Sequence, residues 1–507
     1  MIGPTGAVKV MVATKPVDFR KGAEGLTQII KELQRHRFGR RAGSLPEDQL
    51  LLGLEEAEQI EAAGEEAAER VSADQRQAKA VKRRSNRGSL PAPLPRVEMV
   101  VDIDDHACPC CRNGLHRIGE DVSERLDIVP AQLRVIVVRR PKYACRAREA
   151  VVVQAPAPAR LIEGGLPTET TVAQVPVCKY ADHLPLYRQA QIYARQGINL
   201  DRSTLADWVG RAAWHLRPVH GRLLEKLKSS PKLFADETTA PVLDPGRGKT
   251  KTGQLWAYAR DDRPWQGSGP PGVAYVYAPD RKAERPIAHL AGFTGTLQVD
   301  GYGGYRVLAE KNGVTLAFCW AHVRRRFYEL AVVGPAPIAS EALKRIAELY
   351  KIEDDIRGWT AEARRAVRQE RSRPILAELE PWLREKLGLI SQKTKLAEAI
   401  RYTLSRWEGL TLFLDDGRIE IDSNTVERSI RPIALNRKNA LFAGSDGGAE
   451  HWAVIASLVE TCKLNGVEPL GYLADVLTRI VNGHPNSQID DLLPWAYIVA
   501  PEIKAVA

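Results

Sequence analysis

The chain has 507 residues, of which 44% are apolar and 6% aromatic, so it is long enough for several domains with buried cores. Its 73 basic and 63 acidic residues give a formal charge of +10, which favours a polyanionic partner. No apolar run approaches the roughly 18 residues of a membrane span, and the N-terminus has no signal-peptide pattern, so we expect a cytoplasmic protein without membrane contact.

The first 96 residues form two segments. Residues 1–34 predict a short strand, a loop and a helix, which is too little for a domain of its own. Residues 38–96 begin with an acidic helix, interpreted as solvated or coiled-coil, and end in a basic, proline-rich linker with the run Lys82–Arg87. That linker either solubilises the chain or contacts nucleic acid.

Residues 97–160 predict short strands and contain four of the seven cysteines, an odd total that indicates a reducing compartment rather than a disulfide framework. Cys108 and Cys111 have the C-x-x-C spacing of half a tetrahedral zinc site. Cys145 would supply a third ligand, but Arg148 stands where a fourth cysteine is expected. The alternatives are a zinc site completed by Cys110, His106 or His116, and a zinc ribbon that has lost its metal.

Residues 161–230 predict a helix-turn-helix. A helix from Leu186 to Gln196 ends at Gly197, and a second helix runs from Thr204 to His215 with Asp201 or Ser203 as its cap. A generic helical hairpin is the alternative. The basic character of the chain favours DNA contact.

Residues 231–332 predict a mixed α/β layer. Strands over Lys232–Asp236 and Thr296–Asp300 each end in an acid, and further strands lie at 238–242, 255–259, 273–277 and 314–318. The Gly-rich loop 246–253 is not a P-loop, because that motif needs a glycine where Leu243 stands. A helix is predicted from Trp320.

Residues 333–410 are predicted to be helical, with two apolar stripes that belong in a core: Leu376, Leu379, Leu383 and Leu387, and Leu396, Ile400, Leu404 and Trp407. They interrupt the α/β domain, which resumes over residues 411–445 and contains Glu427 on a helix. Residues 446–507 are predicted as a C-terminal helical segment. Two local alternatives exist for Glu427. It could form a capping box with Asn424, or an ordinary ion pair with Arg431 one helical turn later.

Asp236, Asp300 and Glu427 are the candidate catalytic residues. Two strand-end aspartates and a helical glutamate supply the hard oxygen ligands with which two Mg²⁺ ions can clamp a phosphodiester. Glu237 is a rival ligand. His322 lies near the end of a strand and could approach the site, but the favoured interpretation is a structural histidine. The candidate DNA-backbone contacts are Arg247, Lys249, Lys251, Arg428, Arg431 and Lys438.

Several runs together resemble the transposase of the insertion sequence 66 family, a group of DDE transposases. They are Lys179–Arg188, Asp201–Leu205, Asp236–Thr238, Pro245–Gly253, Asp300–Tyr302, Cys319–His322 with Arg324 and Arg325, and Asp422–Arg431. The resemblance, over about residues 38–507, implies an RNase H-like catalytic core whose triad is Asp236, Asp300 and Glu427. It also implies zinc binding at Cys108, Cys111 and Cys145, Mg²⁺ as cofactor and DNA as substrate.

Residues 1–34, with the run Asp18–Gly22, instead resemble the start of the small accessory protein encoded beside such transposases. The chain is therefore predicted to be a fusion. We expect metal-dependent cleavage of element ends and strand transfer into target DNA, by a homo-oligomer assembled on DNA with help from accessory proteins of the element. The alternatives are an inactive DNA-binding relic and an RNase H-like nuclease without strand transfer.

Overall fold

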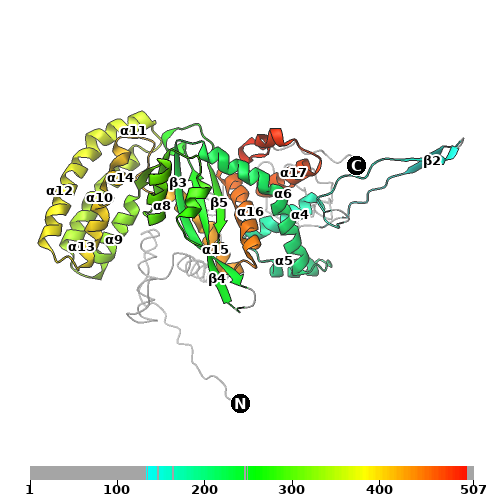
Figure 1. The fold of residues 1–507 in the computed structure, drawn as a ribbon, viewed down its shortest axis with the longest axis horizontal. Coiled ribbons are helices and arrows are strands. Elements are labelled where there is room, and N and C mark those ends of the chain that lie inside the picture. The colour runs from blue at the N-terminus through cyan, green and yellow to red at the C-terminus, as the bar shows by residue number, and fades with distance from the viewer. Residues whose placement is uncertain are drawn as a thin grey trace, which may run out of the picture. The chain divides into compact units, whose positions relative to one another are not determined.

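A computed structural model describes residues 133, 135–145, 148–162, 165–244, 247 and 249–498. The chain divides into two compact units, Met1–Val138 and Arg139–Ala507, and all the elements below belong to the second. The predicted segments 1–34 and 38–96 lie outside the described residues. The second unit is a mixed α/β structure with one large sheet, helices on both of its faces and a separate helical part (Figure 1).

The described part begins with an antiparallel hairpin of β1 (Lys142–Cys145) and β2 (Arg148–Gln154). Three helices follow, α4 (Glu169–Tyr180), α5 (Leu186–Arg195) and α6 (Arg202–Lys228). Gly197 has a φ of +82°, as predicted for the residue that ends α5, and Asp201 is the N-cap of α6. The helix predicted over Thr204–His215 is shorter than α6. The observed helix continues past Pro218, and its buried side chains extend to Leu227.

The central sheet has five strands in the order β5–β4–β3–β6–β7. β3, β4 and β5 are antiparallel neighbours, whereas β6 and β7 run parallel to β3. Their bounds are β3 Lys232–Asp244, β4 Lys249–Arg260, β5 Gly272–Ala278, β6 Thr296–Val299 and β7 Thr315–Phe318. Two predictions are corrected here. β3 does not end at Asp236 but continues for eight residues, because β4 pairs along its length, and Lys249 and Lys251 lie on β4 rather than in a loop.

The two faces of the sheet are covered by different helices. On one face, Trp256 of β4 packs against Tyr305 of α8 (Gly303–Asn312) and His289 of α7 (Glu284–His289). On the other, the Tyr275 hydroxyl of β5 donates to the Ser429 carbonyl of α15 (Asn424–Ala440). α16 (Asp446–Leu464) packs on β5 on this second face, and Figure 1 shows the sheet between α8 and α16.

A helical insertion separates β7 from α15 and has its own core. Its helices are α9 (Trp320–Val333), α10 (Pro337–Asp355), α11 (Ala361–Val367), a π-helical turn (Arg368–Ser372), α12 (Arg373–Leu389), α13 (Lys395–Leu404) and α14 (Trp407–Thr411). Of the eight predicted stripe residues, four are buried in this core and four are partly buried against it. The buried ones are Leu376, Leu379, Leu383 and Ile400, and the partly buried ones are Leu387, Leu396, Leu404 and Trp407.

Buried charges connect the insertion to the sheet. Arg368 is fully buried and donates two hydrogen bonds to Glu353, of 2.8 and 2.7 Å. Arg364 donates to Glu420 in the segment before α15. The backbone carbonyl of Glu420 in turn accepts from the side chain of Gln298 on β6 at 2.7 Å. The insertion therefore fixes the segment that leads into α15 and its register against β6.

After α16 the described residues continue with α17 (Pro469–Val481) and short 3-10 turns, in agreement with the predicted helical segment. Tyr472 of α17 is fully buried and its hydroxyl donates to the Leu492 carbonyl, which holds the turns against the helix. Within the described ranges, no helix combines the length and apolarity needed to cross a bilayer.

The burial of Lys232 should make the free energy of unfolding of the chain depend on pH. Burial lowers its pKa to about 8, below the value of about 10.4 in an unfolded chain. Between these values the unfolded chain binds more protons, so stability rises with pH across this window. Relative to Lys232→Met, the wild-type chain should gain about 2 kcal/mol in free energy of unfolding between pH 7 and pH 10. Urea unfolding at both pH values measures this, and a constant difference would contradict it.

Candidate functional site

The parallel pairing of β3 and β6 places two of the candidate acids side by side. Phe234 of β3 is opposite Gln298 of β6. Asp236 and Asp300 each lie two residues beyond this pair, and the charge of Asp300 contributes to the raised pKa of Asp236, so the two carboxylates are neighbours. Asp300 follows the last residue of β6 directly, as the sequence predicts.

Strand alternation separates Asp236 from its rival Glu237. Asp236 is opposite Ala257, which is opposite Tyr275, so Asp236 shares the face that α15 covers. Glu237 points to the other face. There its carboxylate accepts a 2.9 Å hydrogen bond from the Tyr305 hydroxyl and forms an ion pair with Arg281. Its carboxylate is therefore compensated within the chain.

The insertion holds the backbone beside Asp300. The Asp300 Oδ1 accepts from the Tyr302 amide at 2.9 Å, and its carbonyl accepts from the Tyr402 hydroxyl of α13 at 2.8 Å. Gly301 has a φ of +105°, and a Cβ there would meet Arg406 Nε at 2.6 Å. Arg406 stacks on the Tyr402 ring at 3.8 Å. The turn that presents Asp300 is thus fixed by residues about 100 positions later in the sequence.

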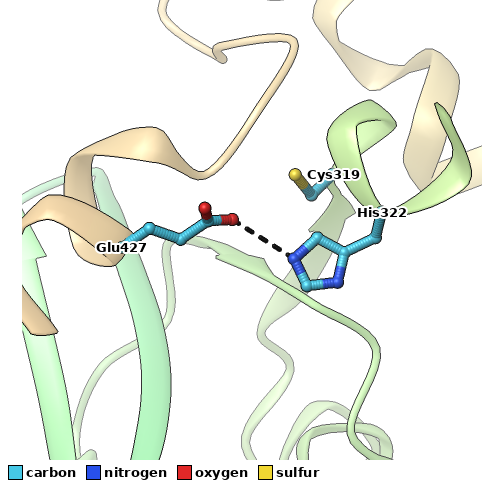
Figure 2. A group of neighbouring side chains, drawn as sticks. All are labelled: Cys319, His322 and Glu427. Carbon is cyan, nitrogen blue, oxygen red and sulfur yellow. Dashed lines mark hydrogen bonds and ion pairs between the residues drawn. The ribbon is translucent and has the colours of Figure 1, made fainter. Parts of the chain in front are cut away.

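Glu427 lies in the first turn of α15 and faces His322 in the first turn of α9 (Figure 2). His322 Nε2 donates to Glu427 Oε1 at 3.2 Å. The capping-box alternative is wrong, because Ser423 is the N-cap of α15 and makes no side-chain cap bond. His322 is also not remote from the site, as a purely structural histidine would be.

Electrostatic interactions connect the four side chains, although among the described residues the group whose ligand atoms all lie within 4.8 Å of one another is Cys319, His322 and Glu427 rather than the three acids. Burial, with the neighbouring carboxylates of Asp300 and Glu237, raises the pKa of Asp236 to about 7. The hydrogen bond to Glu427 raises the pKa of His322, and the charges of Asp300 and Asp236 act in the same direction. The same hydrogen bond lowers the pKa of Glu427. An excess of negative charge that the chain leaves uncompensated is a place for a cation.

Cys319 adds a sulfur atom close to this site. Its Sγ and the ligand atoms of His322 and Glu427 lie within 4.8 Å of one another, as Figure 2 illustrates. Burial raises the pKa of the thiol to about 11, and Sγ accepts from the Ser423 amide at 3.2 Å. A protonated, hydrogen-bonded thiol is a poor ligand, and sulfur does not suit Mg²⁺. Cys319 therefore serves to fix the start of α15 against α9.

The candidate DNA-contacting cations fall into two groups. Arg428, Arg431 and Lys438 are exposed on α15. Lys249 is exposed on the hairpin of β3 and β4, where Arg247 pairs with Asp244 at 3.5 Å and Lys251 with Asp446 at 2.6 Å. The two groups lie along elements that also contain the acids Glu427 and Asp236.

The candidate zinc ligands stay predictions. Cys108 and Cys111 lie outside the described residues, as do the alternatives Cys110, His106 and His116. Cys145 is the last residue of β1, its side chain is not described, and its strand partner is Arg148.

Comparison with known families identifies the chain. Residues 164–451, more than half of its length, match the model described as Transposase IS66 family. The chain belongs to the Transposase IS66 family. Residues 457–495 match the IS66 C-terminal element, and residues 105–147 match the zinc-finger binding domain of transposase IS66. Residues 25–99 match a model described as Transposase C of IS166 homeodomain.

Relatives of this IS66 transposase occur in Sinorhizobium fredii. The uncharacterized protein y4jD is 51% identical over 417 residues, which cover 81% of this chain and 82% of y4jD. The uncharacterized protein y4qI is 48% identical over 488 residues, which cover 93% of this chain and 88% of y4qI. The resemblance that the sequence motifs indicate is thus confirmed at the level of the family.

Proposed function

We propose that this IS66 transposase cleaves the ends of its element and joins them to target DNA by a DDE mechanism, with Asp236, Asp300 and Glu427 as the catalytic triad. The observation that carries the proposal is the convergence of β3, β6 and α15. His322 contacts Glu427 and lies within the electrostatic field of both aspartates. This connection through His322 supports the assignment of the three acids, which come from separate parts of the sequence, to one site.

The topology of the sheet supports an RNase H-like core. Three antiparallel strands are followed by two strands parallel to the first, in the order β5–β4–β3–β6–β7. The first acid lies on the central strand β3 and the second follows the adjacent β6. The helical insertion separates these from the third acid.

The donor set fits divalent cations. Asp236, Asp300 and Glu427 offer carboxylate oxygens, which Mg²⁺ prefers. Glu237, by contrast, already has Arg281 and Tyr305 as partners. Two Mg²⁺ ions bound by the triad would supply charge stabilisation at the scissile phosphate and an activated nucleophile.

The reaction has two in-line displacements without a covalent protein intermediate. In the first, a water oxygen bonds to phosphorus, the P–O3′ bond breaks and a free 3′-hydroxyl remains. In the second, that 3′-oxygen bonds to a target phosphorus and displaces another 3′-oxygen. Arg428, Arg431, Lys438 and the hairpin cations Arg247, Lys249 and Lys251 would hold phosphates without reading sequence. His322 would orient Glu427.

A labelled duplex with one end of the element tests the proposal. With Mg²⁺, the intact chain should nick the end, and Glu427→Gln should bind the same duplex without nicking it. Nicking without any joined product would favour the nuclease alternative. Equal nicking by both proteins would overturn the assignment of Glu427.

His322→Ala should slow cleavage by about 10–100-fold, because an outer residue that orients a ligand carboxylate contributes that much. His322→Gln keeps an N–H donor and should recover part of the rate. Gel-shift affinity for the end should change by less than about twofold, since His322 orients a carboxylate rather than a phosphate. Wild-type cleavage rates in His322→Ala would exclude the orienting role.

The remaining assignments extend the same proposal. The zinc-finger match makes Cys108, Cys111 and Cys145 the ligands to test for Zn²⁺. That segment and the α5–α6 pair would recognise the ends of the element. Residues 1–34 would act as an accessory-like head in a homo-oligomer on DNA.

A further inference from the structure

An exposed apolar pair follows α15 immediately. Leu441 is 65% exposed and Phe442 is 43% exposed. Large apolar side chains that are neighbours on a surface indicate a binding site. The charge around this pair indicates the class of partner that binds there.

The backbone holds the pair in place. Leu441 has a φ of 61°, a left-handed conformation that a leucine adopts at a cost. The next residue but one, Ala443, is hydrogen-bonded to β3 on both sides: its amide donates to the Pro241 carbonyl at 2.9 Å, and its carbonyl accepts from the Leu243 amide at 2.8 Å. Residues 441–443 are therefore attached to the β3–β4 hairpin. We call residues 441–443 the arm.

The segments that form and flank the arm are basic, although Arg247 pairs with Asp244 and Lys251 with Asp446. Residues 239–251 and 437–446 contain five cations, namely Arg247, Lys249, Lys251, Arg437 and Lys438, and two carboxylates. Exposed cations also continue along α15. Arg431 and Lys438 are seven residues apart, about two helical turns, and so lie on one face, with Arg428 beside them. A basic stripe thus leads from Glu427 to the apolar pair.

Two independent paths give the distance from the acids to the arm. Along α15, the 14 residues from Glu427 to Leu441 span about 21 Å. Along β3, the six residues from Asp236 to Val242, the bridge partner of Ala443, span about 20 Å. At 3.4 Å per base step, either path corresponds to about six steps of a DNA strand.

We infer that Phe442, supported by Leu441, stacks on a base of the DNA end about six nucleotides from the scissile phosphate. The inference rests on the proposed function, since it assumes that DNA follows the basic stripe of α15. An aromatic side chain among cations is the arrangement that stacks on bases while the cations hold the backbone. Wedging of an apolar side chain at a base step would also distort the duplex there.

The test uses 2-aminopurine, placed one position at a time within ten nucleotides of the cleavage point in an end-containing duplex, with Ca²⁺ to prevent cleavage. With wild-type protein the fluorescence should change most about six nucleotides from that point. Phe442→Ala should abolish that change and weaken binding roughly 5- to 150-fold. Phe442→Trp should restore both. Trp359→Ala removes an aromatic residue of similar exposure, 47%, on the insertion and is the matched control.

Two results would overturn the inference. The first is an unchanged fluorescence profile in Phe442→Ala while the wild-type chain cleaves the end, which leaves the proposed function intact. The second is altered sedimentation of Phe442→Ala without DNA, together with a normal profile, because the arm would then be a contact between copies of the chain. If wild-type protein neither binds nor cleaves the end, the proposed function fails as well.

Discussion

Asp300→Asn should reduce cleavage of an element end by about a thousandfold or more, equivalent to about 4 kcal/mol in activation free energy. The amide keeps the acceptor that the Tyr302 amide uses, so the turn at Gly301 should persist. It removes the negative charge that a divalent cation requires. DNA affinity, measured by gel shift, should stay within about twofold, because the change removes no phosphate contact.

Glu237→Gln is the matched control for that variant. It is also an isosteric change of a buried acid next to the site, but Glu237 belongs to the opposite face with Arg281 and Tyr305. Cleavage should fall by less than about tenfold, as expected when an outer interaction is lost. Equal losses in the two variants would mean that Glu237 is a ligand. Full activity of Asp300→Asn would remove Asp300 from the triad.

Glu353→Gln should destabilise the chain by about 3–5 kcal/mol. Glu353 is 7% exposed and is the partner of two buried arginines, Arg368 and Arg364. Removing its charge leaves both guanidinium groups partly uncompensated in the core, which is more costly than the pair is favourable. Urea unfolding monitored by tryptophan fluorescence would give the free energy of unfolding. Cleavage should fall as well, because the same network fixes Glu420 against β6.

Glu380→Gln provides the comparison within the insertion. Glu380 pairs with Arg384 one turn along α12, and the Arg384 side chain is 61% exposed. A surface pair of this kind contributes about 0.3–0.5 kcal/mol. Similar losses in Glu353→Gln and Glu380→Gln would show that burial does not determine the contribution of the first pair.

The sequence predicts the elements that carry two of the three candidate acids. Asp300 after a strand and Glu427 on a helix are found as expected, since strand ends and helix starts have local signals. For Asp236 the sequence predicts a strand end, but this residue lies inside β3. The run of buried residues in β3 stops at Asp236 because the strand becomes more exposed there. The pairing of β3 with β4 continues to Asp244.

Other features depend on contacts between distant segments. The role of His322 requires the juxtaposition of α9 and α15, whose first turns are separated by 105 residues. Tyr402 and Arg406 lie among the leucines of a helical insertion, and no local pattern relates them to Asp300. Arg364 and Arg368 have the charge of surface residues, yet they are buried because Glu353 and Glu420 meet them. Such pairings are not readable from one sequence.

The most direct test of a DDE transposase is a strand-transfer assay. Purified chain, Mg²⁺, a labelled duplex with the ends of the element and an unlabelled target plasmid are incubated together, beside the Asp236→Ala variant. We predict nicked ends and labelled plasmid with the intact chain and neither product with the variant. Products of equal yield from both proteins would contradict the triad, and end binding without any product from the intact chain would contradict the transposase activity itself.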